Sequence, residues 1–195
     1  MTRVARVLRY VAFTSMAVFG LLGGLFVAGY AFEDPGGWAA VGMTALWLLP
    51  LVALSVFALL RPEAAAPVFV WVTVAVGLFT LADSLFGLIP RDEWGPVAVV
   101  GVFALSVALA FLGLHRAGLA GLLMIVTGLV QLAAIVVGVV VHEPGDGPGP
   151  GAMLGGSSGV VVMPLLLVGA LFLLSGLVDH EPLRPGPAPR VRPAH

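Results

Sequence analysis

The sequence predicts an all-α protein, a polytopic membrane helix bundle of six transmembrane helices with both termini in the cytoplasm. The first observation behind this prediction is composition, because 60% of the 195 residues are apolar and only 10% are charged. Soluble domains average about 45–50% apolar and about 25% charged residues. A soluble fold of this size buries only part of its apolar surface, whereas lipid can solvate the outward faces of a bundle.

The second observation is a set of six long apolar runs that end at charged residues or prolines. They cover residues 10–32, 38–60, 67–89, 97–114, 119–141 and 160–178. A helix needs about 20 apolar residues to cross the hydrocarbon core. Within lipid only helices and closed barrels satisfy every backbone amide, and the runs lack the ten-residue alternation of barrel strands. Each run is therefore predicted to be one transmembrane helix.

The spans form one predicted domain, residues 1–181, because most connections between them are short and favour antiparallel neighbours. The exception is the segment 142–159, which is rich in glycine and proline and is expected to lack a fixed fold. Residues 182–195 contain five prolines and three arginines. Such a segment cannot build a core, so it is predicted to be a disordered cytoplasmic tail.

The third observation is the distribution of arginine, the only basic residue type other than histidine in this chain. With six spans, eight of the nine arginines fall on one side, and short cytoplasmic loops favour arginine. The eight are Arg3, Arg6, Arg9, Arg61, Arg116, Arg184, Arg190 and Arg192. This split predicts that both termini are cytoplasmic. The excess of Ala, Gly, Val and Pro is typical of a bacterial chain, so the expected location is the inner or plasma membrane.

An alternative for the N-terminal segment is a cleaved signal peptide, since three arginines precede an apolar run. The run has about 23 apolar residues, whereas a signal core has 7–15. Cleavage would leave five spans and an external N-terminus. The longer run favours a retained first helix.

Asp83 is the only carboxylate within a predicted span and lies about six residues before its outer end, roughly 9 Å deep. An ionisable group at this depth is a candidate proton or cation site. The alternative is a carboxyl group near the interface, solvated or bonded to Thr80 or Ser84. Gln131, near the middle of the fifth span, is expected to hydrogen-bond a neighbouring helix. It could reach Asp83 if the third and fifth helices touch.

Small and polar residues recur on single helix faces. Thr80, Ser84 and Thr127 join Asp83 and Gln131 as residues that would line an ion, proton or substrate path between the third and fifth helices. The ordinary role of small residues is close helix packing, within the chain or against a protein partner or second copy. The residues predicted to serve packing are Gly20, Gly24, Ala28, Gly77, Gly87 and Gly138.

Several chemistries are not indicated. The chain has no cysteine, and its four histidines lie at or beyond the membrane edges, so no cofactor or intramembrane metal is predicted. His142, Glu143 and Asp146 form only a weak candidate for a metal site, because the Gly–Pro segment offers little preorganisation. A net charge of −1 gives no attraction to nucleic acid. No nucleophile–base set or phosphate-binding loop is recognisable.

These observations predict a non-enzymatic structural or interaction component of the cell membrane, with the lipid bilayer as its main partner. The alternative is a small transporter or channel subunit that uses Asp83 as an intramembrane proton or cation site.

Overall fold

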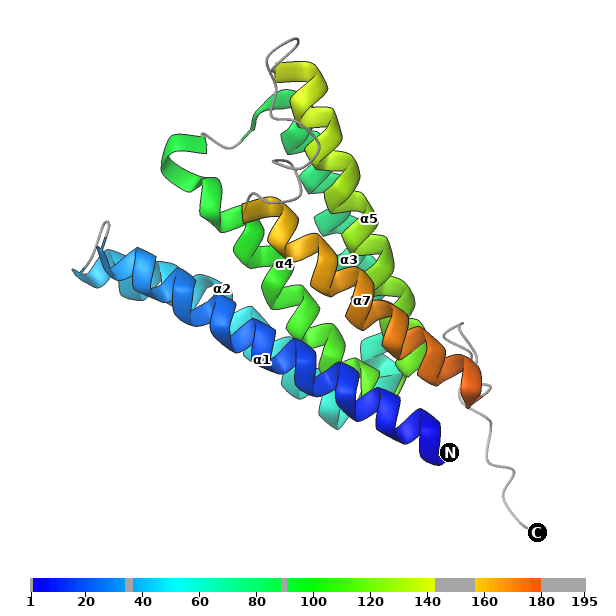
Figure 1. The fold of residues 1–195 in the computed structure, drawn as a ribbon. Helices are drawn as coiled ribbons and strands as arrows, with labels where there is room; N and C mark the ends of the chain where they lie inside the picture. Colours follow the sequence, from blue (N-terminus) through cyan, green and yellow to red (C-terminus); the bar gives the residue numbers. More distant parts are fainter. Residues whose placement is uncertain (1, 34–36, 89–90, 143–156, 180–195) are drawn as a thin grey trace.

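The computed structural model describes residues 2–33, 37–88, 91–142 and 157–179. These residues form a bundle of helices without strands, so the all-α prediction is confirmed (Figure 1). In chain order the helices are α1 (Arg3–Glu33), α2 (Gly37–Leu60), α3 (Pro62–Phe86), α4 (Arg91–Gly113), α5 (Ala117–His142) and α7 (Ser157–Val178). The segment 142–159 was expected to lack a fixed fold, but residue 142 belongs to α5 and residues 157–159 belong to α7. Its remaining part, residues 143–156, and the predicted tail 182–195 lie outside the described residues.

Four of these helices are long and apolar enough to cross a membrane. The qualifying segments are Arg3–Leu25, Pro62–Phe86, Ala117–Gly138 and Val161–Val178. In α2 and α4 the described apolar segments are shorter, Thr44–Leu60 and Gly101–Gly113. By length and composition, the chain is therefore an all-helical protein suited to a membrane.

The ends of the helices follow local capping chemistry. Helix α1 begins at Arg3 because the Thr2 hydroxyl accepts a hydrogen bond from the backbone N–H of Ala5 at 3.2 Å, as expected of an N-cap threonine. Helix α3 begins at Pro62, whose fixed φ suits the first helical turn. The helix therefore starts five residues before the predicted span, and the arginines expected before the first span lie on α1 itself.

Gly87 caps α3, whose last residue, Phe86, is three residues before the predicted outer end of this span. Its φ of 59° lies in the left-handed region, which glycine adopts at little cost. Its backbone N–H donates to the Asp83 carbonyl at 2.8 Å. Gly87 is exposed and caps the helix, and its role in helix packing stays a prediction.

Helices α5 and α7 form the tightest pair, and glycines bring their backbones together. A Cβ atom added to Gly176 would lie 2.5 Å from the Gly118 Cα, and one added to Gly121 would lie 2.6 Å from the Gly169 carbonyl oxygen. The matched residue numbers rise along α5 and fall along α7, so the two helices are antiparallel. Such close approach gives extensive dispersion contact where water is absent.

The other contacts set the directions of the remaining helices. Phe13 packs edge-on against Phe111, and Phe19 lies 5.3 Å from Phe103 between ring centroids, so α1 and α4 are antiparallel. Gly77 faces Val130, and one turn further along α3 Thr80 meets α5 as well. Helices α3 and α5 therefore run in the same direction.

The described core lies toward the end of the bundle that holds the N-terminus and the α4–α5 turn. Fully buried side chains there include Met16, Phe69, Leu112 and Met124, and Phe172 joins them from α7. In Figure 1, α1 and α2 lean away from α3 and α5 toward the opposite end. Side chains from most helices can therefore meet at the end that holds the N-terminus and the α4–α5 turn.

Candidate functional site

The structure brings together two of the predicted path residues at the α3–α5 interface. The Gln131 amide nitrogen donates a hydrogen bond to the Thr80 hydroxyl oxygen at 3.3 Å. Thr80 in turn donates its own proton to the Val76 carbonyl at 2.8 Å. The third and fifth helices thus touch, as the predicted path required, and the hydrogen bond from Gln131 goes to Thr80.

The remaining path residues are distributed along the same two helices. Thr127 is buried and donates its hydroxyl proton to the Leu123 carbonyl at 2.8 Å. Ser84 is buried, whereas Asp83 is half-buried. Because α3 ends at Phe86, Asp83 is only three residues from the helix end, about 4.5 Å along the axis. It therefore lies closer to the end of its helix than the sequence suggested.

Of the predicted packing residues of α1, the structure shows a close contact with another helix at Gly20. Gly20 faces Val107 of α4 so closely that no Cβ atom would fit there without movement of the valine. Gly24 is half-buried. The side chain of Ala28 lies outside the described residues.

Gly77 of α3 is less crowded than Gly20. A Cβ atom on Gly77 would lie 3.5 Å from Val130, which is an ordinary van der Waals distance. Gly138 is buried within α5. The closest backbone contacts are instead those of Gly118, Gly121, Gly169 and Gly176 between α5 and α7. The seven-residue spacing of Gly169 and Gly176 was a sequence signal for this interface.

A buried ion pair connects the start of α1 to the end of α7. The Arg9 side chain is 9% exposed and the Asp179 side chain 13%, and their nearest N and O atoms are 3.4 Å apart. Arg9 also donates to the Leu114 carbonyl at 3.0 Å. The backbone N–H of Thr2 donates to Asp179 at 2.9 Å. Each of these two charged groups thus has a second polar contact, which buried charges require.

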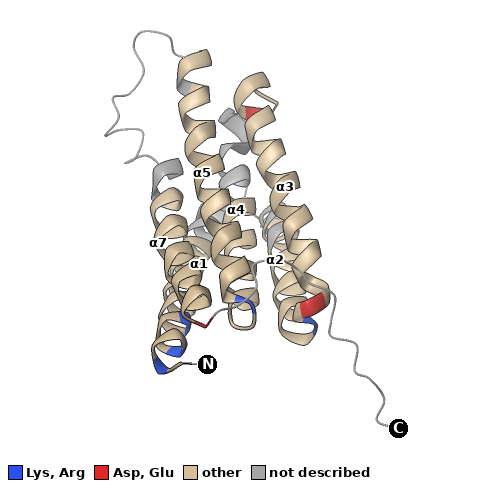
Figure 2. Cartoon of the chain, turned by 90° about the vertical axis from the view of Figure 1, so that its right-hand side faces the viewer, with Lys and Arg blue, Asp and Glu red and all other residues tan. Residues whose placement is uncertain are grey.

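Two further contacts hold the same end of the bundle. The buried Ser175 hydroxyl of α7 donates to the Ala5 carbonyl of α1 at 2.9 Å. Arg116, before α5, forms an ion pair with Glu63 of α3. The arginines whose side chains are described are all on parts of the ribbon at this end (Figure 2). We call it the arginine end, defined by Arg3, Arg6, Arg9, Arg61 and Arg116.

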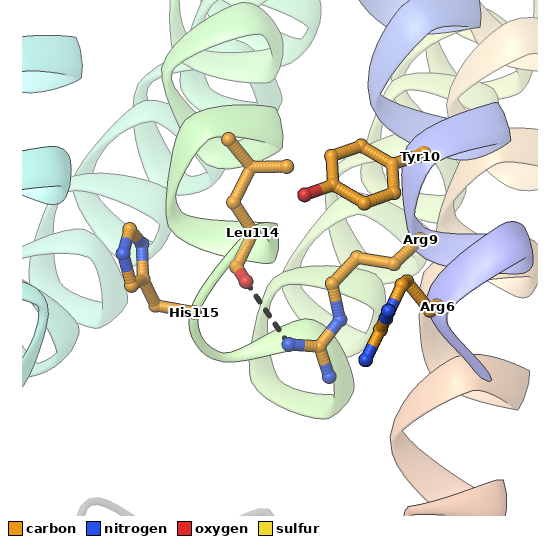
Figure 3. A pocket seen from close by; sticks show the side chains of 5 residues that line it. All are labelled: Arg6, Arg9, Tyr10, Leu114 and His115. Carbon is orange, nitrogen blue, oxygen red and sulfur yellow. Dashed lines mark hydrogen bonds between the residues drawn. The ribbon is translucent and has the colours of Figure 1, made fainter. Parts of the chain in front are cut away.

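A partly enclosed pocket of about 250 Å³ lies at the arginine end. Its lining residues come from α1 and from the α4–α5 turn, and Figure 3 shows the Arg9 side chain extending from α1 to the Leu114 carbonyl of that turn. The lining residues are Arg6, Arg9, Tyr10, Leu114 and His115. From the sequence, the first arginines were predicted only to mark orientation. Their i, i+3 spacing, with Tyr10 at i+4, was the signal that they share a helix face.

The arrangement offers hydrogen-bond donors and positive charge at one end, and helix–helix hydrogen bonds within the bundle. The described residues contain no group of three histidine, aspartate or glutamate side chains placed to hold a metal ion. His142, Glu143 and Asp146, the weak metal candidate, lie outside the residues whose side chains are described. No protein family model, curated protein or solved structure matches this chain.

Proposed function

We propose that this chain is a non-enzymatic structural or interaction component of the cell membrane, with six spans and both termini in the cytoplasm. The arrangement of the described arginines at one end of the bundle carries the topological part of this proposal. Arginine in short loops marks the cytoplasmic side. The arginine end holds the start of α1 and the end of α7, so we propose that both termini are on that side.

The relative directions of the helices support six spans. Helices α3 and α5 are parallel to each other, and α1 is antiparallel to both α4 and α7. This pattern is what successive crossings by every helix would produce. Helices α2 and α4 have 24 and 23 residues, about 35 Å at 1.5 Å per residue. For α2 that length exceeds the ~30 Å hydrocarbon core, and the part of α4 that follows Arg91, Asp92 and Glu93 matches it at about 30 Å.

Topology can be tested by tagging. A cysteine introduced at Gly147 should react with an impermeant thiol reagent added to intact cells, because residues 142–159 are proposed to be external. A cysteine at Thr2 should react only after the cells are permeabilised. The chain has no native cysteine, so each variant carries a single reactive site. Protection of the Gly147 site in intact cells would contradict the proposed orientation.

The structural role is supported by hydrogen bonds between polar side chains of neighbouring helices. The Thr80 hydroxyl donates to its own helix and accepts from Gln131, so the amide of α5 and the hydroxyl of α3 stabilise one interface. Helix association in lipid uses such bonds together with close contacts at small residues. Association with a protein partner or with a second copy would use the lipid-facing sides of the helices.

The contribution of the Gln131–Thr80 bond can be measured by a double-mutant cycle. We expect Gln131→Leu and Thr80→Val to be coupled by about 0.6 kcal/mol, and by no more than ~1.7 kcal/mol, the range found for hydrogen bonds between membrane helices. Unfolding of the purified protein in mixed detergent gives the four free energies. Thr127→Val with Gln131→Leu is the control, since Thr127 donates within its own helix. A coupling free energy no larger than that of the control pair would contradict the proposed hydrogen bond between α3 and α5.

The alternative function is a small transporter or channel subunit that uses Asp83. The α3–α5 contact at Thr80 is the observation in its favour, because the proposed path would follow that interface. If the structural proposal is right, proteoliposomes with the unchanged protein show no more pH-driven flux than empty vesicles. The Asp83→Asn variant then shows the same low flux. A flux in the unchanged protein that Asp83→Asn abolishes would replace the structural proposal with the transporter. Glu63→Gln is the control, since Glu63 is exposed at the arginine end.

A further inference from the structure

The pocket at the arginine end has two walls of different character. Arg6, Arg9 and Tyr10 form one wall, on a single face of α1. Leu114 and His115 of the α4–α5 turn form the other. Figure 3 shows the Arg6 and Arg9 side chains both extending from α1 on the side of this turn. The volume of about 250 Å³ is large enough for a small anionic group.

The two arginines of the pocket differ in what holds them. Arg9 is oriented by the Leu114 carbonyl and by Asp179. Arg6 is exposed and forms no ion pair with any described residue. Asp179 offsets the charge of Arg9, whereas the charge of Arg6 has no such carboxylate among the described residues, so an anion in the pocket would balance it. Phosphate suits this position because its oxygens accept paired hydrogen bonds from guanidinium groups.

The charge balance of the arginine end also favours an anion. Its five described arginines face two carboxylates, Glu63 and Asp179, which gives 5 − 2 = +3. Both carboxylates are already engaged, one with Arg116 and one with Arg9. Arg6 therefore remains available to a ligand from outside the chain.

The position of the pocket indicates where the anion comes from. On α1, Tyr10 is 59% exposed and is flanked by Val7 and Val11, which are about half exposed. An aromatic residue between arginines and an apolar helix surface is typical of the membrane interface. A headgroup phosphate in the pocket would leave its acyl chains beside the apolar side of α1. Basic pockets between helices on the cytoplasmic side commonly bind anionic headgroups.

From this geometry we propose that the pocket lined by Arg6, Arg9, Tyr10, Leu114 and His115 binds the phosphate group of an anionic phospholipid from the cytoplasmic leaflet. This proposal rests on the proposed membrane location. Arg9 provides a fixed donor, Arg6 closes over the phosphate, and the Tyr10 hydroxyl offers a further donor at the rim.

The test is a titration of the purified full chain in detergent, followed by native mass spectrometry, with phosphatidylglycerol and phosphatidylcholine as probes. We expect preferential binding of phosphatidylglycerol, weakened about fivefold by Arg6→Gln, the change expected for one arginine near an anionic surface. Arg61→Gln is the matched control, because Arg61 is exposed at the same end and does not line the pocket. Its affinity should equal that of the unchanged protein.

Three results would overturn the proposal. Equal weakening by Arg6→Gln and Arg61→Gln would indicate general charge attraction, and equal binding of the two lipids would remove the anionic preference. Displacement of phosphatidylglycerol by inorganic phosphate at similar concentration would assign the pocket to free phosphate. The membrane location is tested separately, by measuring whether the chain resists extraction from membranes by alkaline carbonate. A chain that stays in the membrane but fails the titration loses only the lipid proposal.

Discussion

Gly121→Ala should destabilise the bundle by about 2–3 kcal/mol, near the upper end of the usual cost of overpacking. The added methyl group would lie 2.6 Å from the Gly169 carbonyl oxygen and 2.9 Å from the Leu173 Cα. Both atoms belong to the backbone of α7, so no rotamer change can relieve the contact. Helices α5 and α7 would have to separate along their tightest interface.

This effect can be measured as the free energy of unfolding in mixed detergent, monitored by circular dichroism. Gly101→Ala is the control, since no atom lies within 4 Å of the added methyl group. This control should be neutral or slightly stabilising, because alanine is favoured over glycine in a helix. Gly77→Ala should also be tolerated, at 3.5 Å from Val130. If Gly121→Ala were as stable as Gly101→Ala, the close α5–α7 contact would be wrong.

Arg9→Met should cost about 3 kcal/mol, the lower end of the range for a buried ion pair that loses one partner. Methionine keeps much of the length of the side chain but removes the charge. Asp179, whose side chain is only 13% exposed, would then keep the neutral Thr2 N–H as a donor but lose its cationic partner. The Leu114 carbonyl would also lose the hydrogen bond from Arg9.

The unfolding free energies of three variants distinguish this ion pair from general charge effects. Arg3→Met removes an exposed arginine from the same helix and should change stability by less than ~1 kcal/mol. The double variant Arg9→Met with Asp179→Asn should recover most of the loss, because the unpaired charge is gone. If Arg9→Met matched Arg3→Met, or the double variant were no better than the single one, the buried pair would not stabilise the protein.

The sequence predicted the positions of the helices more closely than the contacts between them. The apolar run at 119–141 predicted helix α5 closely, as Ala117–His142. The run at 67–89 missed both ends of α3, because Pro62 and Gly87 act through local backbone geometry and not through hydropathy. At the candidate site, a contact of Gln131 with Asp83 required the third and fifth helices to touch, and they do touch. The partner of Gln131 is Thr80, a detail that depends on the register between the two helices.

The sequence by itself determined the all-helical class and the collection of arginine at the helix ends. Both follow from the preference of each residue for lipid or water, which does not depend on its neighbours in space. Only the tertiary structure decided that Gly121 faces Gly169 and that Arg9 pairs with Asp179. Glycines recur throughout this apolar chain and arginines recur along α1, so their partners depend on helix register and crossing geometry, which only the packed bundle defines.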